Sequence, residues 1–280
     1  MNVQEVPALS RGARLPLAGR RIVLTRPEAQ AGDFVTAVET LGGVPLLAPA
    51  IAVVPPDSWT VVDAAVRRIG TYDWIVFTSA NAVRALVDRA TAIGVGRDEL
   101  RQRRLAAVGP TTGRIVEETL RRADVIPSTH TSEALGSELE DVAGARVLLP
   151  RGDLADDSLP EALRAHGAVP DAVVVYRTVP GHGLATIVEG ICAASIDALL
   201  FTSASAVHFV ETALAEAGIA SSDLRGSLPV VACLGSVTAA VARSAGFPNV
   251  IVSEGTSQAE LIDRVVRWFA RSTNEQEGLS

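Results

Sequence analysis

The sequence predicts an α/β protein made of two similar doubly wound domains with parallel sheets, and three observations support this fold class. The 280 residues are 48% hydrophobic and 20% charged, a composition typical of globular proteins. Short apolar runs alternate with amphipathic segments, which indicates parallel strands covered by helices on both faces. The pattern repeats once, at a spacing of about 125 residues. Solenoid repeats are much shorter, so this spacing indicates two copies of one domain.

The duplication is visible in matching motifs. The segment FTSANAV at 77–83 recurs as FTSASAV at 201–207, an offset of 124 residues. Further landmarks recur in the same order at offsets of 125 or 126 residues: GVP at 43–45 with AVP at 168–170, VG at 108–109 with LG at 234–235, and TS at 131–132 with TS at 256–257. This common order indicates an internal repeat.

The first copy is predicted to begin with a strand at 21–25 and a helix at 28–41. Thr25 and Glu28 have the spacing of a capping box, and Gly42 with the next glycine is expected to end the helix. Further elements are expected in alternation: strands at 44–47, 74–78, 105–108 and 125–126, and helices at 58–69, 80–92, 111–122 and 132–142.

The second copy is predicted to follow the same pattern up to a helix at 257–269. A second capping box, formed by Ser257 and Glu260, marks the start of this helix. Residues 272–280 form a polar tail.

The composition excludes several kinds of function. All 25 basic residues are arginine, so no mechanism with a Schiff-base lysine or a P-loop lysine applies. The net charge of −7 disfavours a nucleic-acid partner. Four histidines without metal-ligand spacing and two cysteines predict no metal site.

The termini and the apolar runs predict a location in the cytoplasm. Residues 1–18 lack the apolar core of a signal peptide, and the longest nearly continuous apolar run, 44–54, is too short to cross a bilayer. We therefore expect a cytoplasmic protein with no membrane partner. We also expect a monomer, because no long exposed apolar helix requires a partner.

Hydroxyl and glycine residues follow the strands of both copies. The turns concerned are 78–79, 109–112 and 131–132, with their partners 202–203, 235–238 and 256–257. Ligands of doubly wound sheets bind at the carboxyl ends of the strands, where N–H groups and helix dipoles attract anions. Two facing copies would form a cleft suited to a ligand with several separated carboxylates. Ordinary helix capping explains the same residues without a ligand, so both interpretations stay open.

Two arginines and one tyrosine are candidates for chemistry near these turns. Arg26 and Arg151 follow equivalent strands, and each would bind a ligand carboxylate or form a surface ion pair with Glu28 or Asp153. The phenol of Tyr176 would donate a proton to a leaving hydroxyl if it lay within hydrogen-bond distance. A half-buried strand tyrosine bonded to water is the alternative, and position alone favours it.

Taken together, these motifs resemble those of uroporphyrinogen-III synthases. The resemblance covers nearly all of residues 21–269. It rests on LTRP at 24–27, FTSANAV at 77–83, VGPTT at 108–112, LPRG at 149–152, VYRT at 175–178, FTS at 201–203 and the late glycine and threonine at 235 and 238. The resemblance implies one domain of 1–49 plus 179–280, a second of 52–176, and a two-stranded linker at 50–54 and 173–178.

The resemblance also implies the reaction. Hydroxymethylbilane, a linear tetrapyrrole, would be cyclised to uroporphyrinogen III with inversion of the last ring, through loss of water and a spiro intermediate. This step belongs to the biosynthesis of haem, sirohaem and cobalamin, and the family needs neither cofactor nor metal. The bilane also closes unaided to the wrong isomer, so positioning would be the main task of the enzyme.

Site residues follow from the resemblance by their place in these motifs. Tyr176 matches the candidate proton donor to the leaving hydroxyl. The residues expected to bind the substrate are Arg26, Ser79, Asn81, Gly109, Thr112, Arg151, Gly152, Ser203, Gly235 and Thr238. Val237 departs from the family pattern, because it stands where many members have a threonine.

Two other functions are compatible with such a sequence. The first is a non-catalytic relative that binds a tetrapyrrole as a regulatory module, and the second is a two-lobed small-molecule receptor. The lack of an appended DNA-binding domain disfavours the first, and the lack of a signal peptide disfavours the second.

Overall fold

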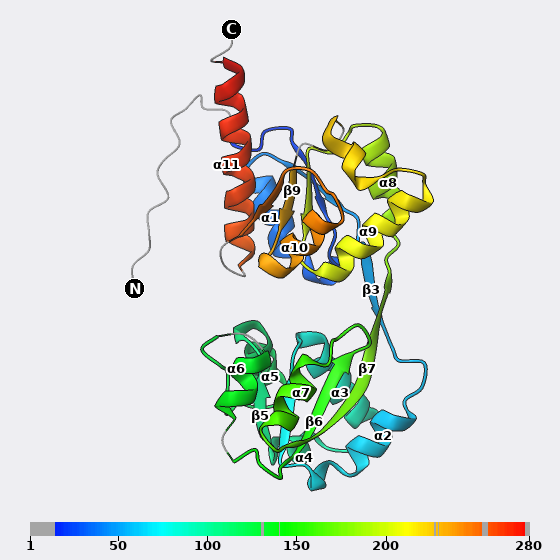
Figure 1. The fold of residues 1–280 in the computed structure, drawn as a ribbon, viewed down its shortest axis with the longest axis vertical. Coiled ribbons are helices and arrows are strands. Elements are labelled where there is room, and N and C mark those ends of the chain that lie inside the picture. Colours follow the sequence, from blue (N-terminus) through cyan, green and yellow to red (C-terminus); the bar gives the residue numbers. More distant parts are fainter. Residues whose placement is uncertain are drawn as a thin grey trace. The chain divides into compact units, whose positions relative to one another are not determined.

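A computed structural model gives the structure of this chain. It describes residues 15–129, 132–139, 141–226, 228, 230–253 and 257–277. The chain divides into two compact units, drawn in Figure 1: unit 1 combines the residues up to Ala52 with those from Pro180 onward, and unit 2 is Val53–Val179. The assignment of these units to separate domains with the boundaries given above stays a prediction.

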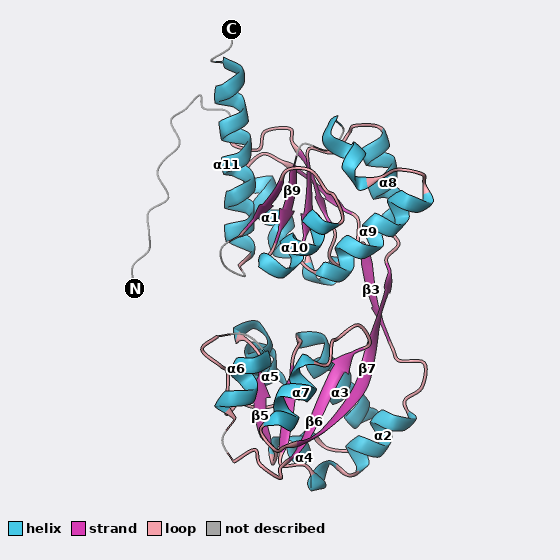
Figure 2. Ribbon diagram, in the orientation of Figure 1, coloured by secondary structure: helices cyan, strands magenta, loops and turns pink. Residues whose placement is uncertain are grey.

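Unit 1 contains a parallel sheet with helices on both faces (Figure 2). In the order β10-β9-β8-β1-β2, its strands are β10 (Val250–Val252), β9 (Val230–Cys233), β8 (Ala198–Phe201), β1 (Arg21–Leu24) and β2 (Val44–Leu47). Its helices are η1 (Glu28–Gln30), α1 (Gly32–Thr40), α8 (Leu184–Cys192), α9 (Ala204–Glu216), η3 (Ser221–Gly226), α10 (Ser236–Ser244) and α11 (Gln258–Glu277).

Unit 2 contains a second sheet of the same kind. In the order β3-β7-β6-β4-β5, its strands are β3 (Ile51–Val54), β7 (Val169–Pro180), β6 (Arg146–Gly152), β4 (Trp74–Phe77) and β5 (Arg104–Ala107). Its helices are α2 (Thr60–Arg67), η2 (Ile69–Thr71), α3 (Ala80–Ala92), α4 (Arg97–Arg101), α5 (Pro110–Thr119), α6 (Ser132–Glu138) and α7 (Ser158–Ala165). The predicted α/β class with two parallel sheets is confirmed.

The two sheets have the same strand order once the repeat is taken into account. By sequence offset, β9, β8, β1 and β2 correspond to β5, β4, β6 and β7, and each set follows this order in its sheet. In unit 1, β1 of the first copy pairs with β8 of the second copy, and β2 of the first copy pairs with β1. Each sheet is therefore assembled from both copies.

The central strands are buried on both faces, which explains their continuous apolar sequences. In β1, Ile22 and Leu24 pack into the core that contains residues of α1 and α11, while Val23 faces the core of α8, α9 and α10. In β4, Ile75 packs with residues of α2, α3 and α5, and Val76 with residues of α6 and α7.

The predicted helix at 28–41 is wrong at its start. The chain forms the short helix η1 before α1, and Thr25 does not cap either one. The Thr25 hydroxyl is buried and donates a hydrogen bond of 2.7 Å to the carbonyl oxygen of Leu200 in β8. Glu28 lies 3.6 Å from His182 instead of completing a capping box.

The predicted end of this helix is confirmed. Gly42 has a φ of 82° and donates its N–H to the Glu39 carbonyl at 2.9 Å, while the N–H of Gly43 reaches the Val38 carbonyl at 2.9 Å. These two hydrogen bonds satisfy carbonyl groups at the end of the helix. The left-handed backbone conformation of Gly42 favours glycine at that position.

Other predicted boundaries need correction. The helix predicted at 111–122 is α5, which starts at Pro110 and ends at Thr119, and the helix predicted at 132–142 is α6, which ends at Glu138. The strand predicted at 125–126 is a single bridge from Val125 to Ala106. Helix α4 was not predicted, because its five residues are too few for a periodic pattern.

The capping box at the start of α11 is confirmed. The N–H of Glu260 donates to the Ser257 hydroxyl at 3.2 Å, and the N–H of Ser257 donates to the Glu260 carboxylate at 3.4 Å. Both bonds satisfy N–H groups at the start of the helix, as the spacing predicts.

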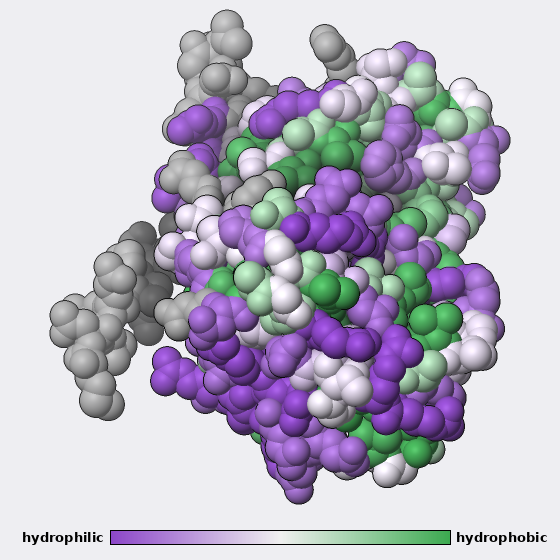
Figure 3. All heavy atoms as spheres, turned by 60° about the horizontal axis from the view of Figure 1, so that its bottom comes forward, coloured by the Kyte–Doolittle hydropathy of each residue, from purple (hydrophilic) through white to green (hydrophobic). Residues whose placement is uncertain are grey.

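None of the helices in the described part of the chain is long and apolar enough to span a membrane. On the face drawn in Figure 3, hydrophilic residues surround smaller groups of hydrophobic ones. Such a mixture is ordinary for a protein surface in water.

Candidate active site

The turn after β4 in unit 2 has the same structure as the turn after β8 in unit 1. Ser79 follows β4 and caps α3 with a φ of −150°, and Ser203 follows β8 and caps α9 with a φ of −153°. The Ser79 hydroxyl accepts the N–H of Ala82 at 3.1 Å, and the Ser203 hydroxyl accepts that of Ala206 at 3.3 Å. Each cap leaves other N–H groups of the first helical turn available to an anion.

A second pair of turns differs in its backbone. Gly109 precedes α5 with a φ of −163°, and Pro110 occupies the first helical turn. Gly235 precedes α10 with a φ of 82° and donates its N–H to the Ser253 hydroxyl at 3.3 Å. The N–H of Gly235 is thus already bonded, so any anion at this turn would depend on the N–H groups that follow.

The threonines of this second pair are mostly buried. Thr112 in α5 is 7% exposed and Thr238 in α10 is 5% exposed. Their predicted contact with substrate carboxylates stays a prediction. The corresponding threonines after the last strands, Thr131 and Thr256, lie outside the described residues.

Arg26, at the end of β1, is a half-buried cation. Its Nη2 donates to Gln30 Oε1 at 3.1 Å, and its guanidinium carbon lies 5.6 Å from the centre of the Phe34 ring. Burial lowers the pKa of Arg26, and the nearby Asp33 carboxylate partly opposes this shift. The alternative ion pair with Glu28 is absent from the described interactions of Arg26.

Arg151, at the end of β6, forms an ion pair, but with a different acid from the one considered. Its Nη1 lies 2.8 Å from Asp157 Oδ1, and its Nη2 donates to the carbonyl of Ala155. Asp153 instead accepts the backbone N–H of Thr178 at 2.9 Å. Arg151 therefore holds the loop after β6 in place, and its side chain is 14% exposed.

Tyr176 lies in β7, beside the end of β6. It is the register partner of Gly152, at a point where the pairing of β6 and β7 shifts. Its phenolic oxygen lies 3.2 Å from the hydroxyl oxygen of Ser79. A Cβ atom at Gly152 would lie 2.6 Å from Cζ and 2.8 Å from Oη of Tyr176. The absence of a side chain at Gly152 therefore makes room for the phenol beside Ser79.

This contact gives the phenol a defined direction for its proton. Ser79 already accepts the N–H of Ala82, so its hydroxyl hydrogen is available to the oxygen of Tyr176. In that arrangement the hydrogen of Tyr176 is free to point to a ligand. The N-terminus of α3 carries partial positive charge, which stabilises negative charge developing on the phenolic oxygen. The group is therefore suited to general acid catalysis.

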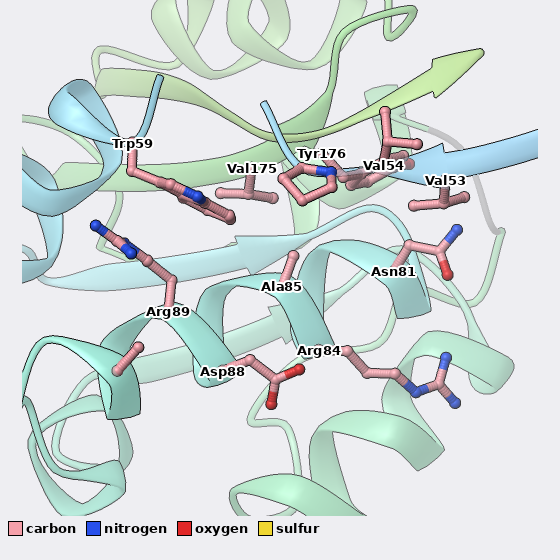
Figure 4. Close-up of a pocket in the computed structure, with 12 residues that line it drawn as sticks. Val53, Val54, Trp59, Asn81, Arg84, Ala85, Asp88, Arg89, Val175 and Tyr176 are labelled. Carbon is pink, nitrogen blue, oxygen red and sulfur yellow. The ribbon is translucent and has the colours of Figure 1, made fainter. Parts of the chain in front are cut away.

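A cavity of about 450 Å³ lies next to Tyr176 in unit 2 (Figure 4). Its wall combines one face of α3 with residues of β3, β7 and the start of α2. The lining residues are Val53, Val54, Pro55, Trp59, Asn81, Arg84, Ala85, Asp88, Arg89, Ala92, Val175 and Tyr176. Two residues predicted from the sequence, Asn81 and Tyr176, thus share one cavity.

The Trp59 end of the cavity is held by an ion pair. Both nitrogens Nε and Nη2 of Arg89 lie 2.6 Å from the carboxylate oxygens of Asp63. The hydrogen bond from Arg89 lowers the pKa of Asp63, against the opposing effect of burial. The guanidinium carbon of Arg89 lies 4.9 Å from the centre of the Trp59 ring, a cation–π contact.

The structure brings together part of the predicted set. Ser79 and Gly152 each lie against Tyr176, and Asn81 lines the same cavity as Tyr176. Gly109, Thr112 and Arg151 belong to other strand ends of unit 2, and Arg26, Ser203, Gly235 and Thr238 belong to unit 1.

Of the residues that line this cavity, only Asn81 and Tyr176 were predicted as site residues, and the aromatic and charged residues missed are Trp59, Arg84, Asp88 and Arg89. None of these residues belongs to a sequence motif described above. One signal was available, because Arg84 and Asp88 follow Asn81 at three and seven positions, on one face of a helix.

The described residues contain no group of three or more histidine, cysteine, aspartate or glutamate side chains placed to hold a metal ion.

Comparisons with known proteins identify the relatives of this chain. A family model described as uroporphyrinogen-III synthase HemD matches residues 32–263. A uroporphyrinogen-III synthase of Synechococcus elongatus is 29% identical over 203 residues, which cover 70% of this chain and 75% of the relative. One of Chlorobaculum parvum is 27% identical over 259 residues, covering 89% of this chain and 100% of the relative.

Solved structures show the same fold. A crystal structure of a mutant uroporphyrinogen III synthase from the extremely thermophilic bacterium Thermus thermophilus matches with a TM-score of 0.65 and 22% identity, over 90% of this chain and 100% of that one. A structure from Helicobacter pylori matches with a TM-score of 0.58 and 15% identity, over 89% of this chain and 99% of that one.

Proposed function

Because the chain belongs to the uroporphyrinogen-III synthase family, a family of porphyrin biosynthesis, we propose that it cyclises hydroxymethylbilane to uroporphyrinogen III. The last ring is inverted and one molecule of water is lost. The proposed reaction breaks one C–O bond to release water. It forms the C–C bond of the spiro intermediate, breaks the older C–C bond of the last ring and forms the C–C bond that closes the macrocycle, without net oxidation or reduction. Its chemistry therefore calls for acid catalysis and positioning and for no redox cofactor.

The contact of Tyr176 with Ser79 is the observation that supports this proposal best. The phenol donates its proton to the hydroxyl of the substrate as the C–O bond breaks, so that water leaves. The Ser79 hydroxyl and the N-terminus of α3 stabilise the phenolate that remains. When the macrocycle closes, the attacking pyrrole carbon loses a proton and its ring becomes aromatic again. The phenolate takes up this proton.

The strand-end turns bind the carboxylates of the substrate in this proposal. Each pyrrole carries an acetate and a propionate, so many moderate anion contacts fix one conformer. Ser79, Ser203, Gly109 and Gly235 each start a helix of at least nine residues at such a turn. Helix N-termini favour carboxylates through free N–H groups and the helix dipole.

Arg26 and Arg151 add the charge that the turns lack. Both follow the equivalent strands β1 and β6, and both side chains are already restrained by neighbours in the structure. A restrained guanidinium loses little conformational entropy when it binds a carboxylate in two places. We further propose that the protein is a monomer that acts in the cytoplasm, as expected from its sequence.

Incubation of the purified protein with hydroxymethylbilane tests the proposed function. The product is oxidised and its isomers are separated by chromatography. We expect the type III isomer, formed faster than the type I isomer that arises without enzyme. Only type I isomer at the spontaneous rate would contradict the proposal, and binding without turnover would then indicate a regulatory relative.

A further inference from the structure

Three charged residues of α3 line the cavity beside Tyr176, and two of them, Arg84 and Asp88, lie near Asn81. Arg84 and Asp88 lie one turn apart on the face of α3 that also presents Asn81 and Ala85. Figure 4 shows these residues following one another along the helix. Both charged residues are exposed, so a ligand in the cavity can reach them without displacing protein.

These two charges are not used within the structure. Among the residues that the structure describes, neither Arg84 nor Asp88 forms an ion pair, whereas Arg89 of the same cavity is held by Asp63. An acid placed four residues after an arginine is the less favourable order for a helical ion pair. Arg84 and Asp88 thus remain open to separate groups of one ligand.

The rest of the cavity is suited to a small flat ring. Val54, Ala85 and Val175 supply apolar surface, and the Trp59 ring closes one end. A volume of about 450 Å³ lies within the usual range for small-molecule sites, ~300–1,000 Å³. Apolar walls with a few polar groups are the usual composition of such sites.

Resting on the proposed function, we propose that this cavity binds the pyrrole ring that carries the hydroxymethyl group of the substrate. Arg84 binds a carboxylate of that ring, and Asp88 accepts the hydrogen bond of its pyrrole N–H. Tyr176, in the same cavity, then lies beside the hydroxyl that leaves. Asp88 also repels a carboxylate from its own position, so the two charges distinguish one orientation of the ring from the reverse.

The same placement assists bond breaking. The C–O bond breaks with its electron pair on oxygen, and the proton of Tyr176 completes the water molecule. The pyrrole nitrogen donates its electron pair into the ring, which leaves a positively charged azafulvenium that keeps its N–H. The Asp88 carboxylate faces this charge and stabilises it more than the neutral ring that precedes it.

Two substitutions with a KM-against-kcat comparison test the proposal. We expect Arg84→Gln to raise KM for hydroxymethylbilane about tenfold with little change in kcat, because a carboxylate contact is lost. The variant Arg84→Lys should recover part of this loss. We expect Asp88→Asn to lower kcat about tenfold to a hundredfold, because the charge that faces the azafulvenium is removed.

Matched controls are available on exposed helix positions outside the cavity. Arg164→Gln in α7 and Glu117→Gln in α5 remove the same charges elsewhere in unit 2. This proposal alone would be overturned if the wild-type protein made type III isomer while Arg84→Gln and Asp88→Asn had the same KM and kcat as these controls. A wild-type protein that makes only type I isomer at the spontaneous rate would remove the proposed function as well.

Discussion

Units 1 and 2 share their strand order and their helix caps but differ in the residues near the strand ends. The serine caps of α3 and α9 agree within a few degrees in φ, and their bonds to the helix differ by 0.2 Å, 3.1 Å against 3.3 Å. The strand order of the sheets is also shared. Both copies of the repeat thus keep the serine caps and the strand order that form these turns.

The tyrosine contact occurs in unit 2 alone. Positions 125 residues before Tyr176 and Gly152 hold Ile51 and Pro27, so unit 1 has neither the phenol nor the open space beside it. In the proposed function both units bind carboxylates, while acid catalysis belongs to unit 2. The predictions that follow test this difference, starting with the largest effect.

Substitution of Gly152 should remove most of the activity. In Gly152→Ala the new Cβ would lie 2.6 to 2.8 Å from atoms of the Tyr176 ring, so the ring must move away from Ser79. We expect kcat to fall about a hundredfold, the usual scale for a general acid, and stability to fall by ~1–3 kcal/mol. Steady-state kinetics and urea unfolding measure the two effects.

The control for this variant is Gly32→Ala at the start of α1. A Cβ there meets no atom within 4 Å, so activity should stay unchanged. Equal losses in both variants would show that the contact of Gly152 with Tyr176 does not matter.

The two serine caps should separate stability from chemistry. Ser79→Ala and Ser203→Ala should each cost ~1 kcal/mol of stability, because each loses one cap hydrogen bond. Ser79→Ala should also lower kcat about threefold to tenfold, because Tyr176 loses its partner. Ser203→Ala should raise KM and leave kcat unchanged. The same change in kcat for both variants would contradict the assignment of catalysis to unit 2.

The arginines at equivalent strand ends should affect binding alone. Arg26→Gln and Arg151→Gln should each raise KM about threefold to tenfold at low salt. The effect should shrink as the ionic strength rises, because added salt screens the attraction between charges. KM values measured from low to high salt check this, and values equal to those of the wild type throughout would assign both arginines to structure.

The glycines of the second turn pair should differ in stability. Gly235 has a φ of 82° with free space around it, so Gly235→Ala should cost ~1–2 kcal/mol through backbone strain alone. Gly109 has an extended φ of −163°, which alanine adopts readily, so Gly109→Ala should change stability less. Urea unfolding of both variants compares them, and an equal cost would show that the backbone difference is unimportant.

Local signals in the sequence were sufficient for many elements. The serine caps, the glycine end of α1 and the capping box of α11 each involve residues within five positions of one another. Their spacing alone therefore predicts the bonds. The repeat added the correspondence between the two sets of strands.

Contacts between distant residues could not be predicted in the same way. Thr25 has the spacing of a cap, but its hydroxyl donates a hydrogen bond to a carbonyl 175 positions away in β8 instead. The contact of Tyr176 with Ser79 spans 97 positions and depends on the order of β4, β6 and β7 in the sheet. Tertiary packing decided both, and no local pattern carries that information.

The rate of a single turnover in Tyr176→Phe tests the central claim most directly. This variant keeps the ring and removes only the hydroxyl, so the fold should remain and the melting temperature should change little. We predict type III product at a rate about a hundredfold below that of the wild type, with substrate binding nearly unchanged. A single-turnover rate equal to that of the wild type would contradict the claim that unit 2 supplies the acid through Tyr176.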